Sequence, residues 1–184
     1  MLNMDFSQRV VININDLDWE PSPAKGVLRK PLAREQKESG HATSIVRYEA
    51  GSRFSRHVHL RGEEILVLEG TFSDENGDYP AGTYIRNPHG SAHSPFSNEG
   101  CVLLVKLEQF ATGDDKETRM DTYAGPWLPG QGNLEVMPLH DFEGEHTALV
   151  KWPANEHFAP HRHFGGEEIL VLSGTFQDEF GAYP

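Results

Sequence analysis

Two histidines and a glutamate occur at a spacing that could bind a metal ion. His57 and His59 are separated by one residue, and Glu63 follows Gly62 a few residues later. Residues i and i+2 of a β-strand project to the same face, so the two imidazoles can converge on one point. Gly62 permits a tight turn, after which Glu63 would open the next strand with its carboxylate facing the same interior. Two imidazoles and one carboxylate arranged in this way bind a divalent metal ion and leave coordination positions open.

A second cluster supplies a candidate fourth ligand. Residues 82–93 read GTYIRNPHGSAH, and a Pro-x-Gly bend precedes His93. We expect His93 to be a ligand, and His89, which lies inside the bend, to be exposed. An H-x-H pair alone is a weak signal, because two histidines on a solvated strand face also produce it. The combination with Glu63 and His93 is more specific.

The stretch that carries the first three candidates occurs twice. HVHLRGEEILVLEGTF, residues 57–72, is echoed 104 residues later by HRHFGGEEILVLSGTF, residues 161–176. The match extends in both directions, from TSIVRYEAGSRF over TALVKWPANEHF to DENGDYP over DEFGAYP. This pattern indicates an internal duplication. We expect a first domain over residues 1–112, a linker over 113–126 and a partial second domain over 127–184.

The second copy repeats three of the four candidate ligands. His161, His163 and Glu167 correspond to the two histidines and the glutamate of the first copy, whereas the counterpart of His93 would fall beyond Pro184. Either the sequence is truncated, or the edge of the second sheet is covered by another element or another protomer. An apolar strand over residues 169–172 would border that edge, and we expect it to favour a homodimer.

Local patterns predict an all-β protein. The segments are short, β-branched or aromatic, and bounded by Gly, Pro, Asn or Asp, as in sandwiches and barrels: residues 42–50, 63–70, 82–88, 100–110, 133–139 and 146–152. Alternation places Glu63 and Ile65 inside a barrel, while Leu66 must be covered from outside by the second copy or a partner chain. Residues 31–39 could form a short helix or a loop.

Composition restricts the partners and the compartment. The formal net charge of −12 disfavours direct binding to nucleic acid. Purely apolar runs reach only four residues, far short of the roughly 20 that span a bilayer, and we expect no membrane association. The N-terminus lacks the pattern of a signal peptide. With a single cysteine, Cys101, the chain forms no internal disulfide, so we expect a cytoplasmic protein.

The two motifs of the first copy resemble those of the cupin superfamily. The first is Gly51, His57-x-His59, Glu63 and Gly70, and the second runs from Gly82 to His93. More narrowly, TSIVRYEAGSRF, GTFSDENGDYPAGTYIRNPHGSAHSPFS and CVLLVKLEQF resemble the cupin domain of ChrR-type anti-sigma factors. The resemblance implies a cupin β-barrel, duplicated here as a bicupin with a truncated second barrel. A consensus asparagine after the last histidine is displaced in this chain.

The resemblance also implies a metal centre and two classes of function. Its ligands would be His57, His59, Glu63 and His93, holding zinc in regulatory members and ferrous iron in related dioxygenases, with Mn or Ni as further options. ChrR-type regulators carry a separate N-terminal sigma-binding domain with its own His/Cys zinc site. This sequence has no such segment, so we expect no sigma factor as partner.

Two functions of different classes follow from these observations. The first is a regulatory or sensory metal-binding protein that responds to a small-molecule ligand. The second is a non-haem Fe(II) dioxygenase that cleaves carbon–carbon bonds of small diketones or hydroxyaryl ketones. No general base stands out beyond the ligands, which favours the first. A sugar-phosphate isomerase has less support, because no Lys-rich anion site lies near the ligands.

Several other residues carry weaker expectations. We expect Cys101 to be a buried small hydrophobe, and Glu64 to point away from Glu63. Arg56 and Arg86 are read either as solvated charges or as anchors for an acidic ligand. Histidines without a matching partner are expected on the surface: His41, His140, His146 and His157. Aromatic residues are expected to fill the barrel or line a pocket: Tyr48, Phe54, Phe72, Tyr84 and Phe96.

Overall fold

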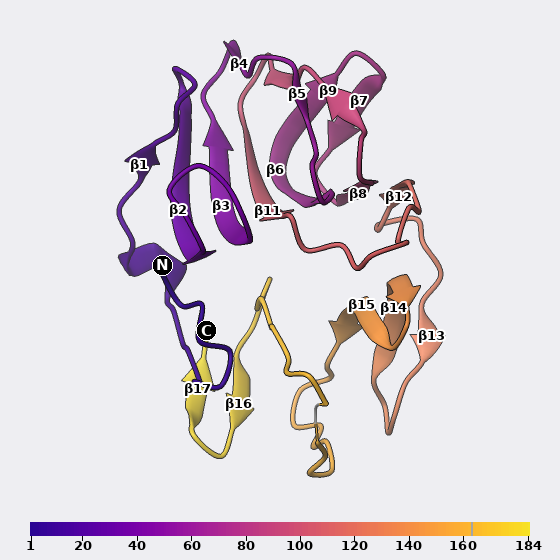
Figure 1. The fold of residues 1–184 in the computed structure, drawn as a ribbon. Coiled ribbons are helices and arrows are strands. Elements are labelled where there is room, and N and C mark those ends of the chain that lie inside the picture. The colour runs from indigo at the N-terminus through magenta and orange to yellow at the C-terminus, as the bar shows by residue number, and fades with distance from the viewer. Residues whose placement is uncertain (163) are drawn as a thin grey trace.

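The computed structural model describes residues 1–162 and 164–184. Apart from one short 3-10 helix, η1 (Ile14–Asp16), the regular structure of these residues is β-strand. Figure 1 shows the strands of the first copy in the upper part of the molecule, and β13 to β17 below them. The predicted all-β class is therefore confirmed.

The first copy is built on a long antiparallel sheet. Its strands follow the order β1-β2-β3-β11-β6, continued by β8 and β12. The bounds are β1 (Glu20–Pro21), β2 (Val27–Arg34), β3 (Ala42–Tyr48), β6 (Glu63–Asp74), β8 (Thr83–Asn87), β11 (Cys101–Leu107) and β12 (Thr118–Asp121). β11 is paired along its whole length, with β3 on one side and β6 on the other. Alternate residues of a central strand point into the core and must be apolar there. In β11 these residues are Cys101, Leu103 and Val105.

β6 bends from this sheet into a second, smaller one. Its first half pairs with β11 and β8, and its second half pairs with β7 (Gly77–Pro80) and β10 (Phe96–Ser97), which in turn pairs with β4 (Ser52–Arg53). The bend falls at Gly70, whose φ is 69° and where a Cβ would lie 2.1 Å from the carbonyl oxygen of Gly100. Only glycine fits this close approach.

The two sheets enclose the core of the first copy. The inner cluster comprises Val27, Tyr48, Ile65, Val67, Phe72, Tyr79, Ile85, Cys101, Leu103 and Val105. Two further short strands, β5 (His57–Val58) and β9 (Ala92–His93), pair with each other in a separate two-stranded antiparallel sheet. The sheets do not close into one continuous ring. Cys101 is buried, as expected.

The outer face of β6 packs against the second copy. Leu66, Tyr84, Met137 and Leu139 form a second buried cluster, with Leu68, Met120, Trp127 and Leu149 packed around it. The second copy supplies β14 (Glu135–Phe142) and β15 (Glu145–Lys151) to this contact. The prediction that Leu66 must be covered from outside is therefore confirmed, and it is the second copy that covers it. Tyr84 belongs to this cluster and not to the interior of the first copy, contrary to expectation.

Structural repetition accompanies the sequence duplication. β13 (Leu128–Pro129), β14 and β15 pair in the same order as β1, β2 and β3, and the bulge at Pro138 matches the bulge at Pro31. A basic side chain lies over the tryptophan of each copy: Arg47 over Trp19 and Lys151 over Trp127. These matches extend the duplication from sequence to packing.

The second copy departs from the first over residues 159–175. The apolar strand predicted at residues 169–172 is wrong, because no strand is assigned there among the described residues. Ile169 is 50% exposed and Leu172 is 53% exposed. In the first copy the equivalent residues pair with β11 and β8, whose counterparts this sequence does not contain, so the ladder hydrogen bonds that would hold a strand are absent. The chain then forms the hairpin of β16 (Phe176–Asp178) and β17 (Gly181–Tyr183).

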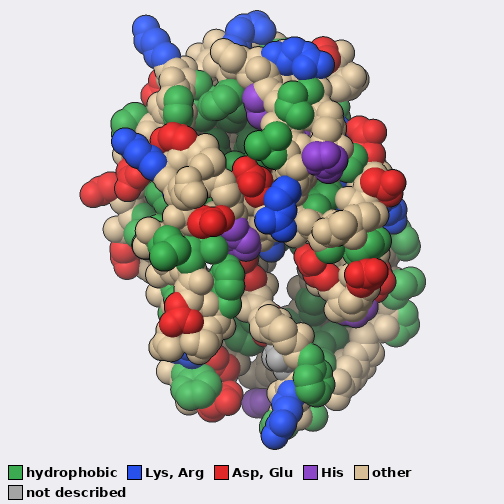
Figure 2. All heavy atoms as spheres, viewed as in Figure 1, with side chains coloured by type: hydrophobic (Ala, Val, Ile, Leu, Met, Phe, Trp, Pro, Cys, Tyr) green, Lys and Arg blue, Asp and Glu red, His purple; other side chains and the backbone are tan. Residues whose placement is uncertain are grey.

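The C-terminal hairpin lies beside the N-terminal arm. The guanidinium of Arg9 lies 4.7 Å from the ring centroid of Phe180 and 5.5 Å from that of Tyr183, and it pairs with Asp178 at 3.5 Å. Figure 1 accordingly shows the N-terminal arm and the β16–β17 hairpin side by side. Figure 2 shows the surface hollowed between the first copy and this lower part.

A buried ionic cluster corrects two expectations. Arg86, which is only 1% exposed, donates to Glu64 at 2.8 Å and to Asp114, and Asp114 also contacts Nε2 of His140 at 2.8 Å. Arg86 is thus neither a solvated charge nor a free anchor for an acidic ligand. His140 is buried and not on the surface, because Asp114 supplies the partner that its ring requires. Glu64 points away from Glu63, as expected.

Three remaining expectations concern residues outside the core. Residues 31–39 form no helix: β2 runs through Arg34 and the chain then bends. Within the predicted linker, residues 118–121 form β12 and pair with β8, while the domain boundaries themselves stay a prediction. No helix among the described residues is long and apolar enough to cross a membrane.

Candidate metal centre

The structure brings the four candidate residues of the first copy together. One ligand atom from each of His57, His59, Glu63 and His93 lies within 4.8 Å of the others. Among the described residues, no other group of three or more His, Cys, Asp or Glu side chains meets this criterion. Register explains the convergence, because β5 and β9 pair His57 directly with His93. Glu63 begins β6 directly after the Gly62 turn, as the spacing predicts.

The three imidazoles surround a common point next to the glutamate. The ring centroids of the three histidines are 4.8 to 5.0 Å apart, and each pair of rings is close to perpendicular. Nε2 of His59 lies 3.3 Å from Oε2 of Glu63, and Nε2 of His93 lies 3.4 Å from the same oxygen. The donor atoms of His59, His93 and Glu63 therefore face one another and not the solvent.

A serine orients His59. Its Nδ1 lies 2.9 Å from Oγ of Ser91, which itself donates to the carbonyl of Pro88 at 2.5 Å. Because that hydroxyl hydrogen is used on Pro88, Oγ is left to accept from Nδ1–H. The tautomer with the proton on Nδ1 presents the lone pair of Nε2 to the centre of the cluster.

An aspartate orients His93. Nδ1 of His93 lies 3.2 Å from Oδ2 of Asp74, and Oδ1 of Asp74 accepts from the hydroxyl of Tyr79 at 3.1 Å and from the backbone N–H of Asn76 at 2.7 Å. A histidine that donates to a carboxylate through one nitrogen is the usual arrangement behind a metal ligand. The effect is to fix the orientation of the ring, with Nε2 directed away from Asp74.

An asparagine orients Glu63. The side-chain amide of Asn87 donates to Oε2 of Glu63 at 2.8 Å, and these two residues are direct partners in the β6–β8 register. Oδ1 of Asn87 accepts in turn from Arg119 at 2.6 Å. Each of the three buried candidate ligands thus has a polar partner behind it, while Nδ1 of His57 contacts the carbonyl of Ser55 at 3.0 Å.

Two buried nitrogens test whether these residues suit a metal ion. Nε2 of His59 and Nε2 of His93 are buried and have no hydrogen-bond partner. A buried polar atom without a partner costs about 1–3 kcal/mol, and so such atoms are rare in folded proteins. Both face a carboxylate, and together with it they form the nitrogen and oxygen donor set that zinc and ferrous ions accept. The cluster could therefore hold a divalent metal ion; that it does so stays a prediction.

Burial acts on one ligand in the direction that metal binding requires. Desolvation lowers the pKa of His59 below its ordinary value, with the nearby Glu63 opposing the shift. Only neutral imidazole ligates a metal ion, so the shift keeps this donor available at neutral pH.

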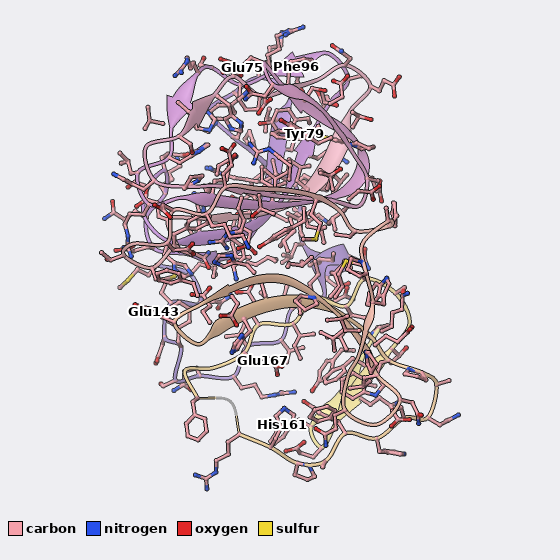
Figure 3. All side chains as sticks on the ribbon, turned by 90° about the vertical axis from the view of Figure 1, so that its right-hand side faces the viewer. Glu75, Tyr79, Phe96, Glu143, His161 and Glu167 are labelled. Atoms are coloured by element: carbon pink, nitrogen blue, oxygen red, sulfur yellow. The ribbon has the colours of Figure 1, made fainter. Side chains whose placement is uncertain are left out.

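Of the second set of candidates, the structure describes His161 and Glu167, and among the described residues these two belong to no cluster comparable to the first. His163 lies outside the described residues, so the second site stays a prediction. His161 and Glu167 lie in the lower part of the molecule, whereas Tyr79 lies in the upper part (Figure 3). Local geometry is nevertheless repeated: Nδ1 of His161 lies 3.0 Å from the carbonyl of Ala159, as His57 does from that of Ser55.

A family model matches almost the whole chain. The ChrR Cupin-like domain model matches residues 7–111 and again residues 115–184, one match for each copy. The chain belongs to the ChrR Cupin-like domain family. The predicted resemblance is thereby confirmed. A comparison with curated proteins gave no match.

Solved structures place this ChrR Cupin-like chain among cupins. A candidate dioxygenase from Nostoc punctiforme PCC 73102 is 16% identical with a TM-score of 0.63, covering 76% of this chain and 59% of that chain. A candidate acetylacetone dioxygenase from Methylibium petroleiphilum PM1 is 20% identical with a TM-score of 0.50, covering 64% of this chain and 90% of that one. The Rhodobacter sphaeroides complex of SigE with the anti-sigma factor ChrR gives 23% identity and a TM-score of 0.44, covering 52% and 51%. At these identities the likeness concerns the fold.

Sequence reasoning missed the residues behind the ligands. Ser91, Asp74, Asn87 and Arg119 were not singled out, and Arg119 lay in the predicted linker. Asp74 carried a usable signal, because the duplication repeats it as Asp178. Both aspartates accept a hydrogen bond from the tyrosine five residues later, at 3.1 and 2.8 Å.

Proposed function

We propose that the first cupin copy is a divalent metal centre with His57, His59, Glu63 and His93 as its ligands. The observation that carries the proposal is the pair of buried, unpartnered Nε2 atoms facing the carboxylate of Glu63, at 3.3 Å from His59 and 3.4 Å from His93. Without a metal ion, these nitrogens would remain desolvated with only a weak contact. Zinc is our first choice of metal, and ferrous iron is the alternative, followed by manganese and nickel.

A regulatory or sensory role is the function that we propose first. Zinc has no redox chemistry, and three nitrogens with one oxygen can complete its tetrahedral shell. In that state the four side chains would fasten β5, β6 and β9 to one another at the end of the sheets. Membership of the ChrR Cupin-like domain family supports this reading. The centre would then respond to a small-molecule ligand.

A dioxygenase is the second candidate, and the exposure of His57 favours it. The other three ligands are buried, whereas His57 is only half-buried. An open side matters, because ferrous iron accepts five or six ligands and would have positions left for substrate and dioxygen. Two rings adjoin the cluster, with Phe54 5.2 Å from His57 and Phe72 6.0 Å from His93 by centroid, and these rings would limit access by water. Two solved neighbours are described as candidate dioxygenases.

Metal analysis followed by an oxygen assay separates the two roles. Protein purified without added metal is analysed for its elements, then loaded with ferrous iron and assayed for oxygen consumption with diketone and hydroxyaryl-ketone substrates. Zinc without turnover supports the regulatory role. Iron with turnover supports the dioxygenase, provided that the His93→Ala variant, prepared in the same way, consumes no oxygen.

Exposed apolar residues in the second copy support a homodimer. Ile169 is 50%, Leu172 53% and Phe164 94% exposed, and burying such side chains between protomers would remove them from water. We also propose a cytoplasmic location. Light scattering at several concentrations tests the dimer, and a monomer at the highest concentration argues against it.

A further inference from the structure

We propose that Arg119 is a positioning residue that locks Asn87 and, through it, the carboxylate of Glu63. The proposal rests on the metal centre proposed above, although its first step concerns the metal-free protein. Arg119 lies in the segment between the two copies and does not touch the ligands. Its charge acts on His59 through space, whereas any positioning effect on the ligands passes through the residues that it contacts.

Register brings Arg119 to the inner face of the sheet. In β12 it is the partner of Ile85 on β8, and Asn87 lies two residues further along β8 on the same face. Nη2 of Arg119 donates to Oδ1 of Asn87 at 2.6 Å, while Nη1 donates to the carbonyls of Arg86 at 2.9 Å and Thr118 at 2.8 Å. The guanidinium is thus held by two backbone oxygens before it reaches the asparagine.

A fixed guanidinium decides which way the amide of Asn87 faces. An asparagine side chain has one oxygen that accepts and one nitrogen that donates. With Oδ1 bonded to Arg119, Nδ2 must point to Glu63, where it donates to Oε2 at 2.8 Å. The flipped amide would place oxygen against a carboxylate and NH₂ against a guanidinium, and both contacts are repulsive. Removing Arg119 removes one of the two contacts that fix this choice and leaves Oδ1 of Asn87 without its donor.

A second contact leads from Arg119 toward another ligand. Its guanidinium lies 5.5 Å from the ring centroid of Tyr79, whose hydroxyl donates to Asp74, the carboxylate behind His93. This path is weaker, because a cation–π contact at the edge of its range orients a ring less strictly than a hydrogen bond. The asparagine path is therefore the one that the proposal uses.

The position of β12 links the site to the packing of the two copies. Met120, the residue after Arg119, points to the opposite face and packs into the cluster that joins the copies. One short strand thus contributes adjacent side chains to the support of the first site and to the contact between the copies.

The test combines a double-mutant cycle with a matched control. The variants are Arg119→Met, which keeps the length of the side chain, Asn87→Ala, and the double variant. Arg47→Met is the control, because Arg47 is also a half-buried arginine over an aromatic ring, at 4.3 Å from Trp19, and it has no contact with the site. Affinity for Zn²⁺ is measured by competition with a chromophoric chelator.

We expect Arg119→Met to weaken Zn²⁺ binding about tenfold, in the range found for residues that orient metal ligands. In the Asn87→Ala background the same change should have almost no further effect, and Arg47→Met should match the wild type. Independent losses in the double variant would overturn the proposal, because Arg119 would then not act through Asn87. So would a wild-type affinity in Arg119→Met.

A measurement without metal separates this inference from the proposed function. In the metal-free protein, ¹⁵N relaxation of the Asn87 side-chain NH₂ group should report a rigid amide, and Arg119→Met should make this amide mobile. Unchanged relaxation in Arg119→Met would overturn the proposal even if the wild type binds Zn²⁺. A rigid amide in a wild type that binds no metal would leave the positioning role intact and overturn the metal centre.

Discussion

Nδ1 of His93 lies 3.2 Å from Oδ2 of Asp74, and the other oxygen of this aspartate is held by Tyr79 and by the backbone of the β6–β7 turn. The aspartate comes from the part of β6 that has crossed into the smaller sheet. Bending β6 at Gly70 is therefore what places a carboxylate behind a ligand that comes from β9. The same strand supplies Glu63 at its other end.

We predict that Asp74→Asn weakens metal binding at the first site by about tenfold or more. The amide cannot hold the imidazole as a carboxylate does, so the ring of His93 is less fixed as a ligand. Asp78→Asn is the control, since Asp78 lies in the same hairpin but accepts from Ser73 at 2.6 Å and from no ligand. Metal titration of both variants checks the prediction, and equal affinities would contradict it.

We predict that Asp114→Asn lowers the free energy of unfolding by about 3–5 kcal/mol. Asp114 joins buried Arg86 of the first copy to buried His140 of the second, and its removal leaves the buried guanidinium without one of its two carboxylate partners. Denaturation by urea measures the change.

An exposed pair in the second copy provides the control for Asp114. Asp141 and His146 are also an Asp–His pair, but both side chains are 69% exposed. Exposed pairs contribute little, so Asp141→Asn should leave the stability almost unchanged. Equal effects of the two substitutions would mean that the buried cluster does not hold the copies together.

We predict that the thiol of Cys101 is unreactive in the folded protein at pH 8. Burial raises its pKa to about 11, so about one thiol in a thousand is ionised at that pH. The folded protein holds the proton of this thiol more tightly than the unfolded chain does. The free energy of unfolding is therefore unaffected by this group below about pH 9, and it decreases as the pH rises from there toward 11. Labelling with a disulfide reagent should be much slower in buffer than in urea, and similar rates would contradict the burial.

Much of the fold follows from local patterns in the sequence. Alternation along residues 63–68 predicted both the inward face and the need for an outer cover, since each face of a central strand must meet a packing partner. The prediction of a strand at residues 169–172 was wrong because the packing partners that such a strand needs are missing there. Its residues copy those of β6, but strand formation depends on neighbours that a local pattern does not contain.

The candidate site divides in a similar way. His57, His59, Glu63 and His93 were predicted because ligands must alternate along strands and follow glycine turns. The orienting residues were not, because Asn87, Asp74 and Arg119 reach the ligands only through long-range register. His140 was placed on the surface because its partner, Asp114, is 26 residues away and in a charged segment.

One comparison of variants tests the metal centre most directly. Zn²⁺ affinity is measured for the wild type, His93→Ala and His89→Ala, where His89 is exposed on the neighbouring bend and its Nδ1 contacts the carbonyl of Leu60. We expect His93→Ala to lose at least a hundredfold in affinity, and His89→Ala to bind as the wild type does. Equal affinities in all three proteins would contradict the site.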